Sequence, residues 1–147
     1  MRADGTIIPL PDLKLGLEEY RKRIVSLAQE CRANGNRCLF LTQPSIWRDN
    51  LDKEYQKFLW FGWVGREFDP KGFLSVSDVA FGMALYNQKL LDICEHENLE
   101  CVDLAMAVPK DLTSFYDDVH FNEGGAVSVA DHITDYLLST RPFSRQL

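Results

Sequence analysis

Two short apolar runs, each placed after an amphipathic helix, constrain the fold of this chain most strongly. Residues 38–42 follow a helical pattern that starts near Leu17 and ends at Gly35, a residue suited to a left-handed helix cap. Residues 100–104 follow a second helical pattern over residues 80–94. Continuous apolar runs of this length after helices are typical of buried parallel strands. The alternation therefore predicts an α/β fold, in which helices cover a parallel sheet.

The remaining sequence predicts one more helix and a long segment without a clear period. The last helix is expected to start near Asn122. Residues 44–74 hold many aromatic side chains, and Ser75 or Ser77 is suited to cap the helix that follows them. Residues 6–8 are a candidate for one further extended piece.

The small number of predicted strands limits what the chain forms by itself. A doubly wound sheet has about five or six strands, and two apolar strands alone would leave an edge open. We therefore expect residues 1–147 to be a single partial α/β domain, the C-terminal part of a larger one. Two alternatives are a homo-oligomer, in which a second copy covers the open edge, and a replacement strand formed by the first eight residues.

The four cysteines form two pairs of equal spacing, Cys31 with Cys38 and Cys94 with Cys101. The closely spaced Cys-x-x-Cys pairs that bind zinc are absent. A domain of this length does not need disulfides for stability. We therefore expect buried free thiols.

Charge and composition exclude several partners. The formal net charge is -6 and no run of Lys or Arg forms a basic patch, so we expect no nucleic acid partner. No apolar run is long enough for a transmembrane segment. The N-terminus lacks the apolar core of a signal peptide, so a cytoplasmic location is the default expectation, with an upstream export signal as the alternative. The histidines form no i,i+4 pair, and we expect no metal and no cofactor.

Asp117 and His120 are the residues best suited to carry chemistry. In a hydrolase, a neutral imidazole takes a proton from a nucleophile, and a carboxylate on its far nitrogen fixes the tautomer. Three residues of separation place this pair on one turn, in a loop that follows a predicted parallel strand, where the sites of α/β proteins gather. The alternative is a helix-capping segment with a surface imidazole.

The sequence from about Leu17 to Leu138 resembles the C-terminal part of the SGNH/GDSL serine esterases. The most specific element of the resemblance is Asp117-x-x-His120 followed by an asparagine and two glycines. Three further stretches support it by order and spacing: Tyr86-Asn87, Val102-Asp103-Leu104 and residues 39–44.

The resemblance implies a three-layer α/β/α sandwich of the flavodoxin-like SGNH type that hydrolyses small-molecule, lipid or carbohydrate esters without a cofactor. It maps Asp117 and His120 onto the catalytic pair. The family takes its serine from a Gly-Asp-Ser segment and an oxyanion-hole asparagine from a Gly-x-Asn-Asp segment, and this chain contains neither. The nucleophile is therefore expected upstream or from another chain. Ser45 follows a predicted strand but has no neighbouring glycine to form an oxyanion nest.

The aromatic segment around Trp60 and Trp63 has three interpretations. It forms a substrate-binding lid, it packs in the core, or it is exposed because a missing part of the domain normally covers it. The second interpretation is favoured. The third leads to an alternative function, a non-catalytic α/β module that acts by association.

Overall fold

A computed structural model of the chain describes residues 5–66 and 69–140. The three long helices and the two parallel strands lie where the sequence predicts them, and a short helix, α4, begins the loop that follows β5. In chain order the elements are β1 (Ile7–Ile8), α1 (Lys14–Ala33), β2 (Leu39–Leu41), α2 (Lys53–Gln56), β3 (Trp63–Arg66), β4 (Asp69–Leu74), α3 (Val76–Glu97), β5 (Glu100–Val102), α4 (Leu104–Ala107) and α5 (Glu123–Ser139).

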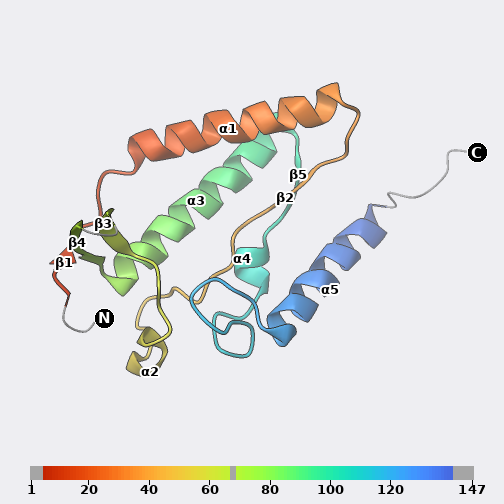
Figure 1. Cartoon of the computed structure of the whole chain (residues 1–147). Helices are drawn as coiled ribbons and strands as arrows, with labels where there is room; N and C mark the ends of the chain where they lie inside the picture. The colour runs from red at the N-terminus through yellow and green to blue at the C-terminus, as the bar shows by residue number, and fades with distance from the viewer. Residues whose placement is uncertain (1–4, 67–68, 141–147) are drawn as a thin grey trace, which may run out of the picture.

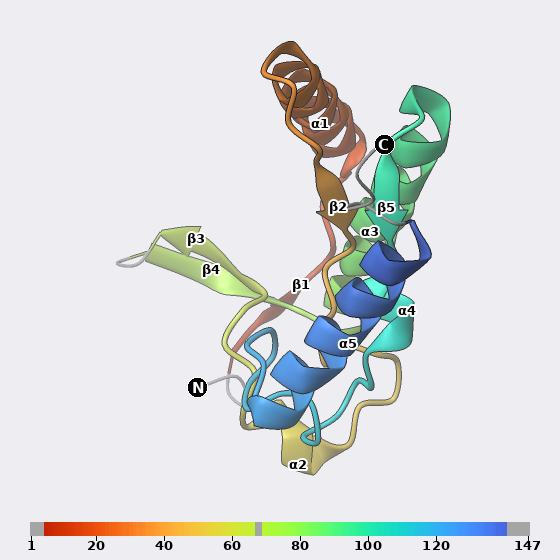
Figure 2. The same ribbon diagram turned by 90° about the vertical axis from the view of Figure 1, so that its right-hand side faces the viewer.

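Strands β2 and β5 form the centre of the molecule. They pair in parallel, with Leu39 opposite Glu100 and Leu41 opposite Val102. Helices α3 and α5 lie on opposite sides of this pair, and α1 packs along α3 (Figures 1 and 2). The mixed α/β character predicted from the sequence is confirmed. The parallel sheet of the described residues has two strands, and a complete sandwich is not seen in them.

The second sheet lies in the aromatic segment, where the sequence shows no period. Strands β3 and β4 form an antiparallel hairpin, and β1 pairs in parallel with β4, with Ile7 opposite Phe73. Gly72 has a φ of +147° and lies so close to the Thr6 carbonyl oxygen that a Cβ would collide with it. Residues 6–8 are extended as predicted, but they pair with β4. The alternative in which they complete the β2–β5 sheet is therefore wrong.

Local capping signals explain the ends of the long helices. The Ser75 hydroxyl caps α3 by accepting a hydrogen bond from the Asp78 amide at 3.0 Å, and the Asn122 side chain caps α5 by accepting one from the Gly125 amide at 3.0 Å. Gly35, just beyond α1, has a φ of +67°. These caps confirm the predicted helix boundaries.

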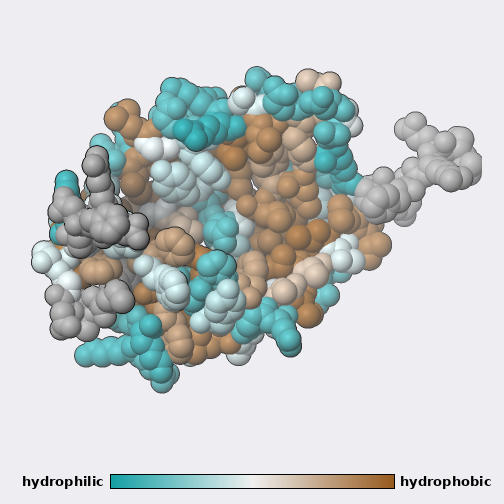
Figure 3. Space-filling model, viewed as in Figure 1, coloured by the Kyte–Doolittle hydropathy of each residue, from teal (hydrophilic) through white to brown (hydrophobic). Residues whose placement is uncertain are grey.

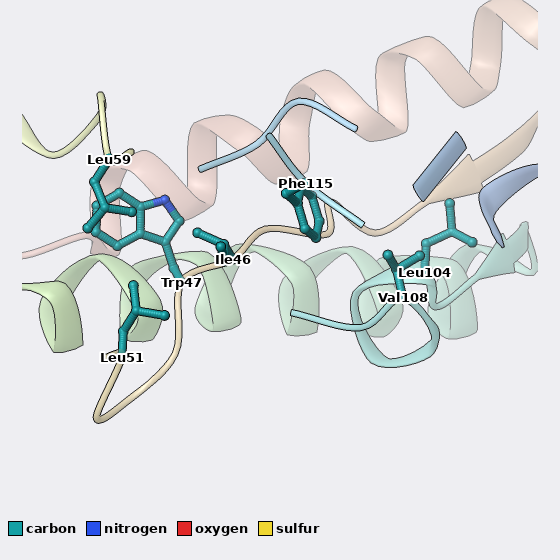
Figure 4. Packing of buried hydrophobic residues seen from close by; sticks show 7 residues of the cluster. All are labelled: Ile46, Trp47, Leu51, Leu59, Leu104, Val108 and Phe115. Carbon is teal, nitrogen blue, oxygen red and sulfur yellow. The ribbon is translucent and has the colours of Figure 1, made fainter. Parts of the chain in front are cut away.

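The larger hydrophobic cluster is formed mainly by side chains of the segments that follow β2 and β5 (Figure 4). Much of it comes from the segment between β2 and β3, whose buried side chains follow no regular period. The cluster consists of Ile46, Trp47, Leu51, Leu59, Leu104, Val108 and Phe115. A smaller cluster, built from Ala28, Phe40, Leu90 and Cys94, joins α1 and α3 to the sheet.

The four cysteines form two disulfides, Cys31–Cys38 and Cys94–Cys101, and the expectation of free thiols is wrong. Each disulfide joins the last turns of a helix to the strand segment that follows, because the connecting turn returns the chain and leaves the two Cα atoms 6.2 and 6.3 Å apart. Disulfides persist mainly in oxidising compartments, so a cytoplasmic location is not supported. None of the described helices is long and apolar enough to cross a membrane.

An apolar surface extends over β2 and β5 and along α5 (Figure 3). Leu41 in β2 is 36% exposed and Leu138 in α5 is 71% exposed. Both residues lie on the elements that form or cover the two-stranded sheet.

The disulfides give the first testable prediction. The denatured, unreduced chain should take up no iodoacetamide, and reduction should release four reactive thiols. Replacing Cys94 and Cys101 together by Ser should lower the free energy of unfolding by about 2–3 kcal/mol, because a short closed loop no longer limits the unfolded chain. Intact mass and urea unfolding measure both effects. Alkylation without reduction would contradict the structure.

Candidate active site

The site is built where β2 and β5 end, because parallel strands deliver their exits to the same edge of a sheet. The Thr42 hydroxyl, which is 1% exposed, joins the two exits. It donates to Asp103 Oδ1 at 2.7 Å and accepts from the Ala105 amide at 2.8 Å. One buried hydroxyl therefore fixes the starting points of both loops.

The segment that leaves β2 is held from two sides. The Asn87 side chain, on α3, accepts from the Gln43 amide at 2.8 Å and donates to the Gln43 carbonyl at 2.9 Å. The Ile46 amide then donates to the backbone carbonyl of Asp118 at 3.1 Å. Ser45, 4% exposed, lies between these anchors, so the segment runs directly beside the turn that carries the predicted catalytic pair.

That turn is closed at its base by a small antiparallel bridge. Phe115 and Phe121 form the bridge with ring centroids 5.2 Å apart, and the Tyr116 amide donates to the His120 carbonyl at 3.2 Å. Phe115 is 1% exposed and anchors the turn in the core. The bridge leaves Asp117 to His120 as a tight loop, in which Asp117 and Asp118 are buried and His120 is exposed.

Two glycines let α5 begin directly against this turn. A Cβ on Gly125 would collide with the Ser114 carbonyl oxygen, and one on Gly124 would lie 2.5 Å from the Thr113 carbonyl oxygen. The glycines that follow His120 in the sequence are therefore required by close backbone packing.

Asp117 and His120 are paired as the sequence predicts. His120 Nδ1 lies 2.8 Å from Asp117 Oδ2, while Asp117 Oδ1 accepts from the amides of Val119 at 2.9 Å and His120 at 2.8 Å. Asp117 is 6% exposed, whereas 59% of the His120 side chain is exposed, and the Tyr116 ring stacks on the imidazole at 5.6 Å. The carboxylate is fixed at both oxygens, and more than half of the His120 side chain is open to solvent.

Burial and hydrogen bonding act in opposite directions on the Asp117 carboxyl. Burial raises its pKa, but the amides of Val119 and His120 and the His120 side chain together outweigh burial and lower the pKa below its usual value. Asp117 is therefore a carboxylate at neutral pH. An ionised acceptor at Nδ1 favours a proton on that nitrogen and leaves Nε2 as the acceptor.

The other predicted site residues, Trp60 and Trp63, belong to the aromatic segment, and their side chains are exposed. Trp60 is 74% exposed, Phe61 51% and Trp63 44%, whereas Leu59 of the same segment is buried. The favoured interpretation, that the aromatic segment packs in the core, is therefore wrong for these three rings. Their role in substrate binding stays a prediction.

Asp118 is a residue that sequence reasoning did not single out. Its side chain is fully buried, and Oδ2 accepts from the amides of Trp60 at 3.0 Å and Phe61 at 2.7 Å. The sequence signal for it is the Asp117-Asp118 doublet, because two adjacent side chains in a tight turn cannot both face the imidazole. Through Asp118 the aromatic segment is tied to the turn that carries His120.

Within residues 5–66 and 69–140, no three His, Cys, Asp or Glu side chains are placed to hold a metal ion. Comparison of the chain with protein-family models, with curated proteins and with solved structures found no match. The resemblance to the SGNH/GDSL esterases therefore stays a prediction from the sequence.

The lowered pKa of Asp117 gives a prediction with a defined sign. A depressed carboxyl pKa stabilises the fold above the unfolded value of about 3.9, and this contribution is lost as pH falls through the lower folded value. At pH 7, Asp117→Asn should therefore be less stable than wild type by about 1–2 kcal/mol, and the difference should shrink as the pH falls below the unfolded value and through the lower folded one. Urea unfolding at several pH values measures it. Asp131→Asn, at an exposed site on α5, is the control and should show no such gap.

The close approach of α5 gives another prediction. Gly125→Ala should lower the free energy of unfolding by about 1–3 kcal/mol, because the added methyl group meets rigid backbone. Gly82→Ala in α3 is the matched control, since its Cβ would lie 3.6 Å from Leu13, an ordinary contact. There, the better helix propensity of Ala should raise stability by up to about 1 kcal/mol. Equal stability of the two variants would contradict the packing described here.

Proposed function

We propose that this chain carries the acid–base pair of a serine ester hydrolase of the SGNH/GDSL type, with His120 as the general base and Asp117 as the residue that orients it. The observation that carries the proposal is the 2.8 Å contact between His120 Nδ1 and a buried Asp117 carboxylate. The exposed imidazole beside the exits of two parallel strands supports it.

In the proposed reaction, His120 Nε2 takes the proton of a serine hydroxyl as its oxygen attacks the ester carbonyl. The imidazolium, stabilised by Asp117, then gives that proton to the departing alcohol oxygen, and an acyl-serine remains. Water attacks the acyl group with the same base, which releases the acid and restores the serine.

The serine and the oxyanion donors are proposed to come from an upstream segment or from another chain. The chain has no Gly-Asp-Ser and no Gly-x-Asn-Asp segment, and Ser45 is buried without a flanking glycine. The placement of α3 and α5 on opposite sides of β2 and β5 supports a three-layer sandwich with further strands (Figure 2). The two disulfides support an oxidising compartment outside the cytoplasm.

The first test of this proposal is labelling with a fluorophosphonate, which modifies activated serines, followed by intact mass. The chain alone should stay unmodified and should hydrolyse esters little or not at all. A stoichiometric adduct at Ser45 would contradict the proposal of a separate nucleophile.

The second test supplies a segment or partner with a Gly-Asp-Ser motif. Labelling and ester hydrolysis should then depend on His120, and His120→Ala should lower turnover by about 10²–10⁴-fold. The free energy of unfolding of this variant should change by less than about 1 kcal/mol, because the imidazole is largely exposed. His96→Ala, at the exposed end of α3, is the control and should leave turnover unchanged. Full activity without His120 would show that it is not the base.

A second candidate function is a non-catalytic module that acts by association. The exposed rings of Trp60, Phe61 and Trp63 favour it, because large apolar surfaces drive assembly. Light scattering of the purified chain discriminates the two. A monomer that becomes active with a supplied serine supports the hydrolase, and a stable oligomer that gains no activity supports the module.

A further inference from the structure

Asp118 occupies an unusual position for a carboxylate. It is 0% exposed, and one of its oxygens, Oδ1, is buried with no hydrogen-bond partner among the described residues. Burying a carboxylate with an unsatisfied oxygen is costly, so stability alone does not account for Asp118. Its other contacts show what it holds.

Asp118 links its own turn to two other segments of the chain, the one at Ile46 and the one at Trp60 and Phe61. Its Oδ2 accepts from the amides of Trp60 and Phe61 at 3.0 and 2.7 Å, and its carbonyl accepts from Ile46 at 3.1 Å. The residue itself lies in the turn between Asp117 and His120. Bonds from two successive amides to one charged oxygen fix the direction of the segment that donates them.

The segment held in this way is strongly apolar. Residues 58–65 contain no charged side chain, and Trp60 and Phe61 remain largely exposed although their backbone is fixed. Because their amides are fixed by Asp118, the exposed rings of Trp60 and Phe61 provide apolar surface beside the turn that carries His120. Apart from two indole N–H groups, residues 58–65 offer no side-chain hydrogen-bonding group for the hydroxyls of a sugar, whereas an alkyl chain requires only apolar area.

We propose that Asp118 is a positioning residue, which fixes the Trp60–Phe61 segment as the apolar wall of the site and so selects esters with a long alkyl acyl chain. The inference rests on the proposed hydrolase function. Asp118 contacts neither the imidazole nor the reacting atoms, and it acts through the backbone of the two aromatic residues.

The test uses a ligand that needs no nucleophile. Methyl heptyl ketone keeps the carbonyl and alkyl chain of an ester but is not hydrolysed, and methyl ethyl ketone is the short-chain comparison. In ¹⁵N-labelled protein, the long ketone should shift the indole signal of Trp60 and the backbone signal of His120 with one shared binding curve. The short ketone should bind at least about tenfold more weakly, because it buries less apolar area.

Two variants test the role of Asp118 itself. Asp118→Asn should speed hydrogen exchange of the Trp60 and Phe61 amides and weaken binding of the long ketone by about tenfold or more, through the loss of a charged acceptor. The amide signals of Val119 and His120 should keep their positions, because Asp117 still holds them. Asp131→Asn removes an equal charge from an exposed site and should change neither readout.

If Asp118→Asn fails to fold, Trp60→Ala provides the same test at an exposed residue. It should weaken binding of the long ketone, while Phe81→Ala, an exposed ring on α3 in the groove between α1 and α3, should not. Equal binding of both ketones, or unchanged binding in either Asp118→Asn or Trp60→Ala, would overturn the inference. Because no turnover is measured, these outcomes are distinct from failure of the proposed hydrolysis, which the fluorophosphonate test reports.

Discussion

The parallel pairing of β2 with β5 is the constraint on which the rest of the structure depends. Parallel strands end on the same side, so the segments that follow them must cross the same edge of the sheet. The buried Thr42 hydroxyl fixes both exits, through Asp103 and Ala105. The loops that carry Ser45, Asp118 and the Asp117–His120 pair are therefore brought together although they lie far apart in the sequence.

Two neighbouring carboxylates in one turn have different tasks, which the backbone separates. Asp117 accepts from amides of its own turn and keeps one oxygen for the imidazole, whereas Asp118 points inward and binds the backbone of a distant segment. The two aspartates therefore have different hydrogen-bond partners although they are neighbours in the sequence. Both belong to the turn that the bridge between Phe115 and Phe121 closes.

The sequence predicts the elements whose signals are local. The helices were found from apolar period and capping residues, the two parallel strands from short apolar runs, and the Asp117–His120 contact from a spacing that fits one turn. The β3–β4 hairpin was not predicted, because its pairing partners follow no alternation that marks a buried face. The exposure of Trp60 and the inward direction of Asp118 depend on contacts between distant segments, which no local pattern reports. The disulfides were missed because chain length was taken to make them unnecessary, while the geometry of each helix–strand turn makes them available.

Both disulfides bridge the same sequence separation of seven residues within a single helix–strand unit. Each therefore closes a covalent ring around one helix–strand turn, residues 31–38 or residues 94–101, and neither connects one unit to the other. The segment between β2 and α3 is then the sole covalent link between the two rings. A single peptide-bond cut there would leave two pieces with no covalent link, joined by noncovalent contacts such as the strand pairing, the packing of α1 on α3 and the hydrogen bonds of Thr42. Each disulfide therefore stabilises one helix–strand unit, whereas the association of the two units after such a cut depends on noncovalent contacts alone.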